Sequence, residues 1–348
     1  MERRIIVDDE LKNREFSVNA KPIFIVGMNG SGTTMVQDCL DRHPYLYGFP
    51  RETRLIPYYI QNLASYGDLN NDENFYRLWN DFRNISLFKS VNNGKLPEIP
   101  DNWSSWPRNI ASIFDGVYSQ FSKKKGKNTR WVEKTPMNVL HMIEIAEVFP
   151  NARFIHMVRD GRDCAASFHR RWKYNAQWTV FRWKNVVSTA REQGQSLGKS
   201  YLEVRYEDLT NDPEKWMKIV CAFVDVEFNS AVLESKQRHY EGKNTENAST
   251  SQIVPNSQKW RKYFSSSQLK KLELIGGVTL QDFGYETIYE AKNLHPSKWK
   301  LKYWVYSNYL RRGAAEFIIQ IRKNKGRSWR YLFSHIINAI RQRKTTKF

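Results

Sequence analysis

The feature that most constrains this chain is a glycine-rich segment near its start, KPIFIVGMNGSGTTMVQDCLDRH at residues 21–43. The apolar run Ile23–Val26 predicts a short buried strand, because a proline and a glycine bound it. The apolar residues that follow the glycines have helical spacing and predict a helix: Met35, Val36, Cys39 and Leu40. Between the two elements, Gly27, Gly30 and Gly32 let the backbone curl, so that its N–H groups and the helix N-terminus face an anion.

This loop predicts a nucleotide-binding site that differs from a phosphoryl-transfer site. Six consecutive residues are the expected contacts to the anionic group: Asn29, Gly30, Ser31, Gly32, Thr33 and Thr34. A P-loop kinase or hydrolase has a lysine at the position of Thr33 and uses the next hydroxyl to hold magnesium. The sequence therefore favours nucleotide binding without a metal. A P-loop kinase or NTPase, and a plain glycine turn in an ordinary α/β domain, are the alternatives.

The rest of the chain alternates strand patterns with helix patterns. Strands are predicted at 129–135, 152–158 and 201–206, and helices at 137–149, 178–191 and 213–223. The alternation predicts an α/β fold in three layers, with a parallel sheet, helices on both faces and a P-loop-like core. Residues 61–127 predict a helical insertion that forms either a lid or acceptor wall or plain outer helices. We expect a polar lead-in at 1–20, one domain at 21–290 and a basic helical tail at 291–348.

Basic side chains are predicted at the ends of two later strands. Arg159 follows a buried strand at the edge where open α/β sheets bind ligands, and Ser167 lies two turns into the next helix. An arginine and a hydroxyl at such a place suit a second phosphate group, although a surface Arg–Asp turn gives the same pattern. Lys134, in the sequence EKTP, either supplies the cation that the glycine loop lacks or is solvated.

A carboxylate between two arginines is the candidate base. Glu52 lies between Arg51 and Arg54 in the sequence RETR. It is either a general base beside an anionic ligand or simply ion-paired, as such clusters usually are. His156 lies in the middle of a predicted strand, and we interpret it as a core residue.

Taken together, these motifs resemble sulfotransferases that use 3′-phosphoadenosine 5′-phosphosulfate as their sulfuryl donor. IFIVGMNGSGTTM is similar to the family's 5′-phosphosulfate loop, and VRDGRDCAASF to its 3′-phosphate site, with Arg159 and Ser167 at the matching positions. EKTP, YEDLTNDP at Tyr206–Pro213 and SQKWRKYFS at Ser257–Ser265 are also similar to family motifs. The resemblance covers about residues 21–287. It implies that Tyr206, Ser251 and Lys259 contact the nucleotide, the last two from a loop that closes over it.

The segment RETRLIP at 51–57 resembles the part of tyrosylprotein sulfotransferases that carries the catalytic glutamate. This resemblance implies that Glu52 is the base and that Lys134 stabilises the leaving oxygen. We expect the sulfuryl group to be transferred in line and without a metal. Arg51 and Arg54 would then contact or organise the substrate. The family commonly has an arginine or lysine at the position of Gly30, and our hypothesis is that Arg51 or Arg54 replaces it. A protein that has lost catalysis but still binds nucleotide is the alternative.

Charge and cysteine placement bear on location. The net charge is +19, and residues 291–348 hold 15 basic residues and one acidic residue, a net charge of +14. Helical periodicity in this tail, with aromatic residues at Trp299, Tyr303, Trp304 and Tyr306, predicts a basic amphipathic segment on an anionic membrane surface. Docking of the tail on the domain is the alternative, and nucleic-acid binding is a weaker third.

Three cysteines lie in apolar patterns without metal spacing: Cys39, Cys164 and Cys221. They predict core thiols in a reducing compartment and no metal site. No signal-peptide pattern and no membrane-spanning run is recognised, so we expect a cytoplasmic enzyme, and the basic tail predicts that it is peripheral at a membrane. The acceptor is a hydroxyl of a glycan, a glycolipid or a tyrosyl peptide, and the sequence leaves these alternatives open.

Overall fold

The structure is a computed structural model that describes residues 21–124, 126, 130–234, 253, 255 and 258–323. The chain divides into two compact units. The first lies within Met1–Arg159 and Val186–Ser257, and the second within Asp160–Asn185 and Gln258–Phe348. The first unit holds the sheet, and the described residues of the second are mostly helical.

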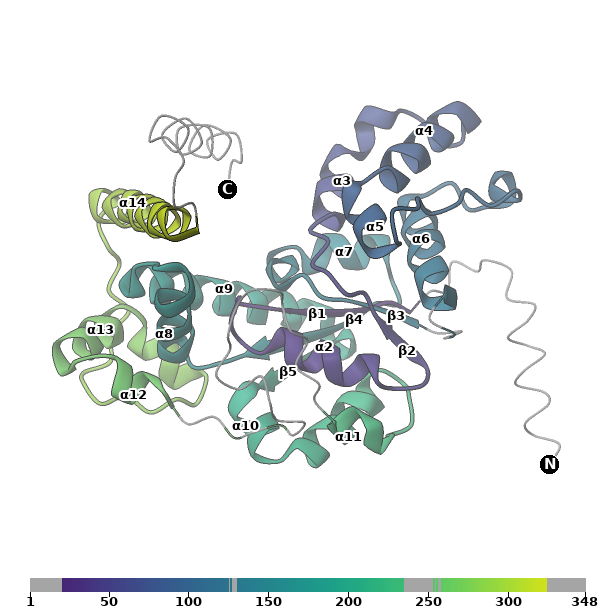
Figure 1. Ribbon diagram of the computed structural model, residues 1–348. Coiled ribbons are helices and arrows are strands. Elements are labelled where there is room, and N and C mark those ends of the chain that lie inside the picture. The colour runs from purple at the N-terminus through teal and green to yellow at the C-terminus, as the bar shows by residue number, and fades with distance from the viewer. Residues whose placement is uncertain are drawn as a thin grey trace. The chain divides into compact units, whose positions relative to one another are not determined.

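The first unit is built on a five-stranded sheet in which all neighbouring strands are parallel (Figure 1). The strands are β1 Ile23–Gly27, β2 Leu46–Gly48, β3 Arg130–Glu133, β4 Arg153–Val158 and β5 Tyr201–Arg205. Their order in the sheet is β2-β3-β1-β4-β5, so the strand before the glycine loop lies in the centre. Phe24 of β1 lies opposite Glu133 of β3 and Phe154 of β4. The predicted α/β fold with a parallel sheet is confirmed.

The prediction located four of these strands and missed β2. β2 has three residues and pairs with β3, with Leu46 opposite Arg130. A strand this short shows no periodicity, so nothing in its sequence distinguishes it from a turn. It matters for the site because it brings the chain that follows it beside β3.

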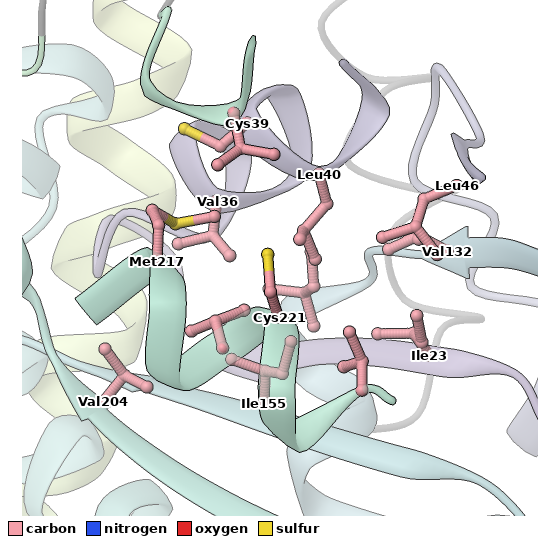
Figure 2. Close-up of a cluster of buried hydrophobic side chains, with 14 of the residues drawn as sticks. Ile23, Val36, Cys39, Leu40, Leu46, Val132, Ile155, Val204, Met217 and Cys221 are labelled. Carbon is pink, nitrogen blue, oxygen red and sulfur yellow. The ribbon is translucent and has the colours of Figure 1, made fainter. Parts of the chain in front are cut away.

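One face of the sheet is covered by α2 (Thr33–Asp41) and α11 (Pro213–Phe223), with α10 (Tyr206–Asn211) on the same side (Figure 1). Figure 2 shows the apolar cluster between helices and strands, which includes Ile23, Val36, Cys39, Leu40, Ile155, Met217 and Cys221. Burial raises the pKa of the Cys39 thiol to about 12 and that of Cys221 to about 11. All three cysteines are buried and free, as expected of core thiols.

The other face is covered by aromatic side chains. The ring centroid of Phe24 lies 5.7 Å from that of Trp131 and 5.3 Å from that of Phe154. Tyr118 of α6 (Ile110–Lys124) stacks on Trp131 at 4.7 Å. One helix of the predicted insertion therefore packs directly on the sheet as an outer helix.

The other elements of this region pack onto α6 or onto one another. They are α3 Ile56–Asn62, η1 Leu63–Tyr66, α4 Asp72–Arg83, α5 Ser86–Val91 and η2 Trp103–Ser105. Trp79 of α4 meets Trp106 at 4.7 Å between ring centroids, and Phe82 meets Phe114 of α6 at 4.4 Å. The aromatic richness that marked this stretch in the sequence is thus the core of a helical layer.

The prediction of one helix at 137–149 is wrong in one respect, because the structure has two elements there. The turn η3 covers Pro136–Leu140 and α7 covers Met142–Val148. Between them His141 leaves the helical conformation, with φ −133°. The remaining connections of the first unit are η4 Gly198–Ser200 and η5 Ser230–Leu233.

The second unit contains α8, α12, α13 and α14, and α9 begins in it. Their bounds are α8 Gly161–Trp172, α9 Ala176–Leu197, α12 Trp260–Tyr263, α13 Ser266–Asp282 and α14 Lys298–Lys323. Trp260 and Trp304 are buried in its apolar cluster with residues of α9 and α13. The helical periodicity predicted for the tail at 291–348 is confirmed over α14, whereas the part of this prediction at 324–348 lies outside the described residues.

Among the described helices, none has both the length and the apolar character needed to cross a bilayer.

Candidate active site

All five strands of the parallel sheet deliver a candidate residue at the same edge. The glycine loop follows β1, Glu52 comes after β2, Lys134 follows β3 directly, Arg159 follows β4, and Tyr206 follows β5. Since the carboxyl ends of parallel strands meet at one edge, five segments that lie far apart in the sequence converge there. The described part of the first unit therefore brings together the candidates that the sequence named singly.

The glycine loop requires glycine at two positions. Gly27 has φ +145°, and a Cβ there would lie 2.4 Å from the Met157 carbonyl oxygen of β4. Gly32 has φ +97°, and a Cβ there would lie 2.4 Å from the ring of Tyr206. At both positions a Cβ would clash with a neighbouring residue and the positive φ disfavours a side chain, so the loop can pass this close to its neighbours only with glycine there.

The loop leaves hydrogen-bonding capacity unused. Gly32 is the N-cap of α2 and supplies no side-chain cap, so the N–H groups of Thr33 and Thr34 in the first helical turn face outward from the helix end. The Ser31 hydroxyl is fully buried, and no hydrogen-bond partner for it occurs among the described residues. Asn29 is half-buried beside them. Helix N–H groups, the positive end of the helix dipole and a buried hydroxyl together suit an anion.

Arg159 is held over this loop by two contacts. Its Nη1 donates to the Gly30 carbonyl oxygen at 3.3 Å. Its guanidinium carbon lies 4.3 Å from the centroid of the Tyr206 ring, which is cation–π distance. Because the same ring lies against Gly32, Tyr206 joins the arginine to the loop. A guanidinium fixed at the edge of an anion cradle can bind a second phosphate in a bidentate manner.

Glu52 and Lys134 form a direct ion pair across 82 positions of sequence. Lys134 Nζ donates to Glu52 Oε1 at 2.9 Å, and Arg54 Nη2 donates to Glu52 Oε2 at 3.2 Å. The Lys134 side chain is only 1% exposed and that of Glu52 is 27% exposed, so the interpretation of Lys134 as a solvated lysine is wrong. An ammonium group has three N–H donors, and among the described residues Glu52 is the one partner found for them.

The two arginines beside Glu52 do not reach the glycine loop in the structure. Arg54 is 75% exposed at its side chain, pairs with Glu52 and adopts a left-handed conformation with φ +57°. Arg51 is exposed. The arginine that contacts Gly30 is Arg159 instead. A left-handed arginine is strained relative to ordinary conformations, and such strain is common where a loop is held for function.

A buried carboxylate holds the segment around Glu52 against the end of β3. Glu133 accepts hydrogen bonds from the Thr53 hydroxyl at 2.8 Å, the Thr135 N–H at 3.1 Å and Asn138 Nδ2 at 3.0 Å. The Thr135 hydroxyl donates to Glu133 at 2.5 Å and accepts the N–H groups of Thr53 and Arg54, each at 3.2 Å. We name Glu133, Thr53 and Thr135 the strand-end clamp. It fixes Thr53 and Arg54, which follow Glu52, and it includes the residues on both sides of Lys134.

The clamp was missed by sequence reasoning. Burial raises the pKa of Glu133, and the hydrogen bonds from Thr135 and Thr53 oppose that rise. The motif EKTP was interpreted through its lysine alone, although its glutamate ends a strand whose preceding residues are apolar. A carboxylate flanked by Trp-Val and Lys-Thr at a strand end was the available signal.

Two predicted site residues belong to the second unit, and one lies outside the described residues. Ser167 is buried on α8, and exposed Lys259 is the N-cap of α12. Within that unit the N–H of Trp260 donates to Asp163 at 3.0 Å, and the Arg162 guanidinium carbon lies 3.8 Å from the centroid of the Trp260 indole ring. These contacts fix the start of α12. Ser251 is outside the described residues.

His156 is the core residue that the sequence indicated. It is fully buried on β4, and its Nδ1 lies 2.6 Å from the Tyr201 hydroxyl. Burial lowers the pKa of His156 to about 4, so the ring is neutral at physiological pH. In the part of the chain that the structure describes, no group of three or more His, Cys, Asp or Glu side chains could hold a metal ion.

Comparison with known proteins points to one family. A model of the sulfotransferase family matches residues 22–230, which include the whole sheet. The chain is 27% identical over 245 residues to the protein-tyrosine sulfotransferase of Drosophila melanogaster, covering 67% of this chain and 44% of that protein. It is 28% identical over 223 residues to protein-tyrosine sulfotransferase A of Caenorhabditis elegans, covering 62% of this chain and 52% of that one.

The chain thus spans about half the length of the curated relatives it matches. Among solved structures, it is similar to the sulfotransferase domain of the Synechococcus PCC 7002 olefin synthase. The TM-score is 0.52 with 22% sequence identity, covering 78% of this chain and 98% of that domain. At this identity the likeness supports the fold.

Proposed function

Because the chain belongs to the sulfotransferase family, we propose that it transfers a sulfuryl group from 3′-phosphoadenosine 5′-phosphosulfate to an acceptor hydroxyl. The observation that carries this proposal is the Glu52–Lys134 pair at the same sheet edge as an anion cradle. The pair offers a base and a cation, and the cradle offers a place for the donor's phosphosulfate. The ion pair or the cradle alone would be weak support for this activity. Their convergence at one sheet edge, from the ends of five strands, is stronger support.

The residues of the loop fit the nucleotide. Ser31 has a buried hydroxyl that finds no partner in the part of the chain the structure describes, and no side chain caps the N-terminus of α2, so both can bind the 5′-phosphosulfate. Arg159 would hold the 3′-phosphate, since its guanidinium is already positioned at the loop. The ring of Tyr206 orients that guanidinium through a cation–π contact. We assign Ser167, Ser251 and Lys259 to the same nucleotide from the resemblance of their motifs.

The transfer itself needs a base and a cation. When bound, the donor supplies a sulfuryl group attached to a phosphate that can leave. Glu52 takes the proton of the acceptor hydroxyl as the new oxygen–sulfur bond forms, a step worth about 10²–10⁴-fold in rate. Lys134 stabilises the negative charge that develops on the departing phosphate oxygen as the old sulfur–oxygen bond breaks. We propose that no metal takes part, since a sulfuryl group carries less charge than a phosphoryl group and Lys134 supplies the cation.

For the acceptor we propose the hydroxyl of a tyrosyl peptide. Support comes from the relatives named protein-tyrosine sulfotransferases and from the position of Glu52 in a segment that resembles theirs. Arg51 is exposed beside Glu52, and Arg54 is exposed while it pairs with Glu52, so both suit contacts to an acidic peptide. A glycan or glycolipid hydroxyl is the alternative acceptor.

We also propose that the enzyme is cytoplasmic and peripheral at a membrane. Three buried free thiols suit a reducing compartment. The +14 charge of residues 291–348 suits an anionic surface.

The first test is calorimetric binding of 3′-phosphoadenosine 5′-phosphate, without magnesium, to the wild type and to Arg159→Ala. We expect tight binding to the wild type and an affinity about tenfold to a hundredfold lower in the variant, because charge-assisted hydrogen bonds are lost. Arg153→Ala is the matched control, since Arg153 lies at the opposite end of the same strand. A folded wild type that does not bind, or an Arg159→Ala variant that binds equally well, would contradict the nucleotide assignment.

A second measurement separates the acceptors and tests catalysis. Labelled donor is offered with an acidic tyrosyl peptide and, separately, with a glycan and a glycolipid. Label on the peptide alone supports the tyrosyl acceptor, and label on the sugar alone replaces it. Nucleotide binding with no transfer to any acceptor would identify a protein that has lost catalysis.

A further inference from the structure

The helix α14 presents two different faces. Its inner face is buried in the second unit, where Trp304 joins the apolar cluster and Ser307 and Asn308 are also buried. Asn308 Oδ1 accepts the N–H of Asn175 at 2.6 Å, so this face is held by polar contact as well as by packing. Trp304 therefore does not belong to the membrane-facing aromatic set that the sequence suggested.

A second face of α14 carries four large apolar side chains that remain exposed. They are Trp299 at 81%, Tyr303 at 65%, Tyr306 at 64% and Leu310 at 58% exposed, and we name them the outer stripe. Their spacing of four, three and four residues places them within about 60° of one another at about 100° per residue. Single exposed apolar residues are ordinary, whereas four aligned on one helix face indicate an interaction surface.

Basic side chains flank the outer stripe. Lys298, Lys300, Lys302 and Arg311 belong to the same part of α14, and no acidic residue occurs between 291 and 311. Lys302 Nζ lies 5.3 Å from the centroid of the Trp299 ring, so its ammonium group is within cation–π distance of the aromatic ring. This part of α14 therefore has apolar side chains and positive charges next to one another on its surface.

The basic surface extends from α14 to the end of α8 in the same unit. Burial lowers the pKa of His169, and the charges of Arg311 and Lys173 lower it further, which places these two cations near one ring. The last turn of α8 also holds Arg170 and Arg171. Cations from α14 and from the end of α8 thus meet at His169 in the second unit.

We propose that the outer stripe of α14 is the surface by which this protein binds the interface of an anionic lipid bilayer. Tryptophan and tyrosine suit the headgroup level because each has an apolar ring and a polar group. The flanking cations would pair with anionic headgroups. A nucleic acid would use the cations but leave a leucine and a tryptophan stripe without a partner. The proposal deepens the peripheral attachment proposed above and rests on it, but it places the contact on described residues.

The test is sedimentation of the full-length chain with lipid vesicles. We compare phosphatidylcholine vesicles with vesicles that also contain phosphatidylserine. The stripe variant replaces Trp299, Tyr303, Tyr306 and Leu310 by serine, and all four are exposed, so the fold should persist. We expect binding of the wild type to the anionic vesicles, and at least about a tenfold loss of partitioning in the stripe variant. A Lys298→Gln, Lys300→Gln, Lys302→Gln variant should lose the preference for the anionic vesicles.

A matched control replaces three exposed apolar residues elsewhere by serine: Tyr45, Tyr76 and Leu294. It should bind vesicles as the wild type does. Equal partitioning of the wild type and the stripe variant would overturn the proposal, as would a wild type that binds neither kind of vesicle. Self-association or DNA binding that depends on the stripe in the absence of vesicles would also overturn it. Transfer to a soluble acceptor should be the same in all four chains, so a protein without transfer activity would contradict the proposed function and leave this surface untouched.

Discussion

The sheet edge has two sides that are built on different physical principles. We call the glycine loop, Arg159 and Tyr206, at the ends of β1, β4 and β5, the phosphate side. We call Glu52, Lys134 and the strand-end clamp, at the ends of β2 and β3, the transfer side. On the phosphate side, no described residue bonds to the Ser31 hydroxyl or caps the N-terminus of α2 through a side chain. On the transfer side Glu52 is paired with two cations and Glu133 accepts four hydrogen bonds.

The difference shows how each side meets the cost of burying polar groups. A buried neutral hydroxyl or backbone N–H without a partner costs about 1–3 kcal/mol, which is less than an unpaired charge costs, so the phosphate side can be open. A buried ammonium or carboxylate costs several kcal/mol when it is unpaired, so the charges of the transfer side must compensate one another. Donor binding should therefore depend on the phosphate side, and the rate of transfer on the transfer side.

The largest effect is expected from Glu52→Gln on the transfer side. The amide cannot take a proton from the acceptor, so kcat should fall by about 10²–10⁴-fold. Binding of 3′-phosphoadenosine 5′-phosphate should change little, because the phosphate side is intact. Kinetics with a peptide acceptor and calorimetry on the same sample measure both. A fall in nucleotide affinity equal to the fall in kcat would show that the two sides are not separate, and unchanged kcat would remove Glu52 from the role of base.

The two sides also differ in how well the sequence predicts them. The cradle of the phosphate side lies within a few consecutive residues between a strand and a helix, so the local sequence pattern was enough to name its candidate residues. Arg159 was predicted because β4 is a long apolar run and its end is plain. What pattern could not show is that Arg159 itself contacts Gly30 and Tyr206. That contact depends on the order of β1, β4 and β5 in the sheet.

The transfer side was predicted residue by residue but not as an arrangement. Glu52 and Lys134 were each named with an alternative, and their pairing depends on β2 lying beside β3. β2 is too short to be predicted, so the pairing could not be derived. Glu133 was missed for a different reason. A glutamate is almost always exposed, so full burial of this one follows only from the threonines that satisfy it.

The second largest effect is a loss of folding stability in acid, and it should arise in the strands that support the phosphate side. His156 on β4 has a pKa of about 4 in the fold against an ordinary value of 6.5. Between these pH values His156 binds a proton in the unfolded chain but not in the folded one. The contribution of His156 to the free energy of unfolding is therefore fully present above pH 6.5 and is lost as the pH drops toward 4. The full loss is about 3 kcal/mol. Burial raises the pKa of Glu133, which has the opposite sign, so the clamp does not add to this loss in acid.

Urea unfolding at pH 7.5, 6, 5 and 4 measures this dependence. His156→Gln is the comparison, because an amide can still bond to the Tyr201 hydroxyl but does not titrate. The variant should lose less stability than the wild type over this range. Equal slopes for the two proteins would assign the acid sensitivity to another group.

Gly32→Ala should weaken nucleotide binding by about tenfold. Its φ of +97° disfavours a side chain, and the new methyl would meet the Tyr206 ring that supports Arg159. Gly94→Ala is the matched control, since Gly94 has φ +82° but no atom within 4 Å of the added methyl. The control should lose stability and keep nucleotide affinity. Equal affinity losses in the two variants would mean that the contact with Tyr206 has no part in binding.

The smallest effect is expected from Thr135→Val, which removes one hydroxyl from the strand-end clamp at nearly constant volume. Without it the N–H groups of Thr53 and Arg54 lose their acceptor, and the segment that carries Glu52 is held less firmly. We expect kcat to fall a few-fold while nucleotide affinity stays the same, because a small displacement of a base costs rate before it costs binding. Thr135→Ser should restore the rate. Thr179→Val removes another buried threonine hydroxyl, one that bonds to Asn175 in the second unit, and should lower stability without changing kcat. If Thr135→Val and Thr179→Val slowed transfer equally, the clamp would be ordinary packing, and the transfer side would consist of Glu52 and Lys134 alone.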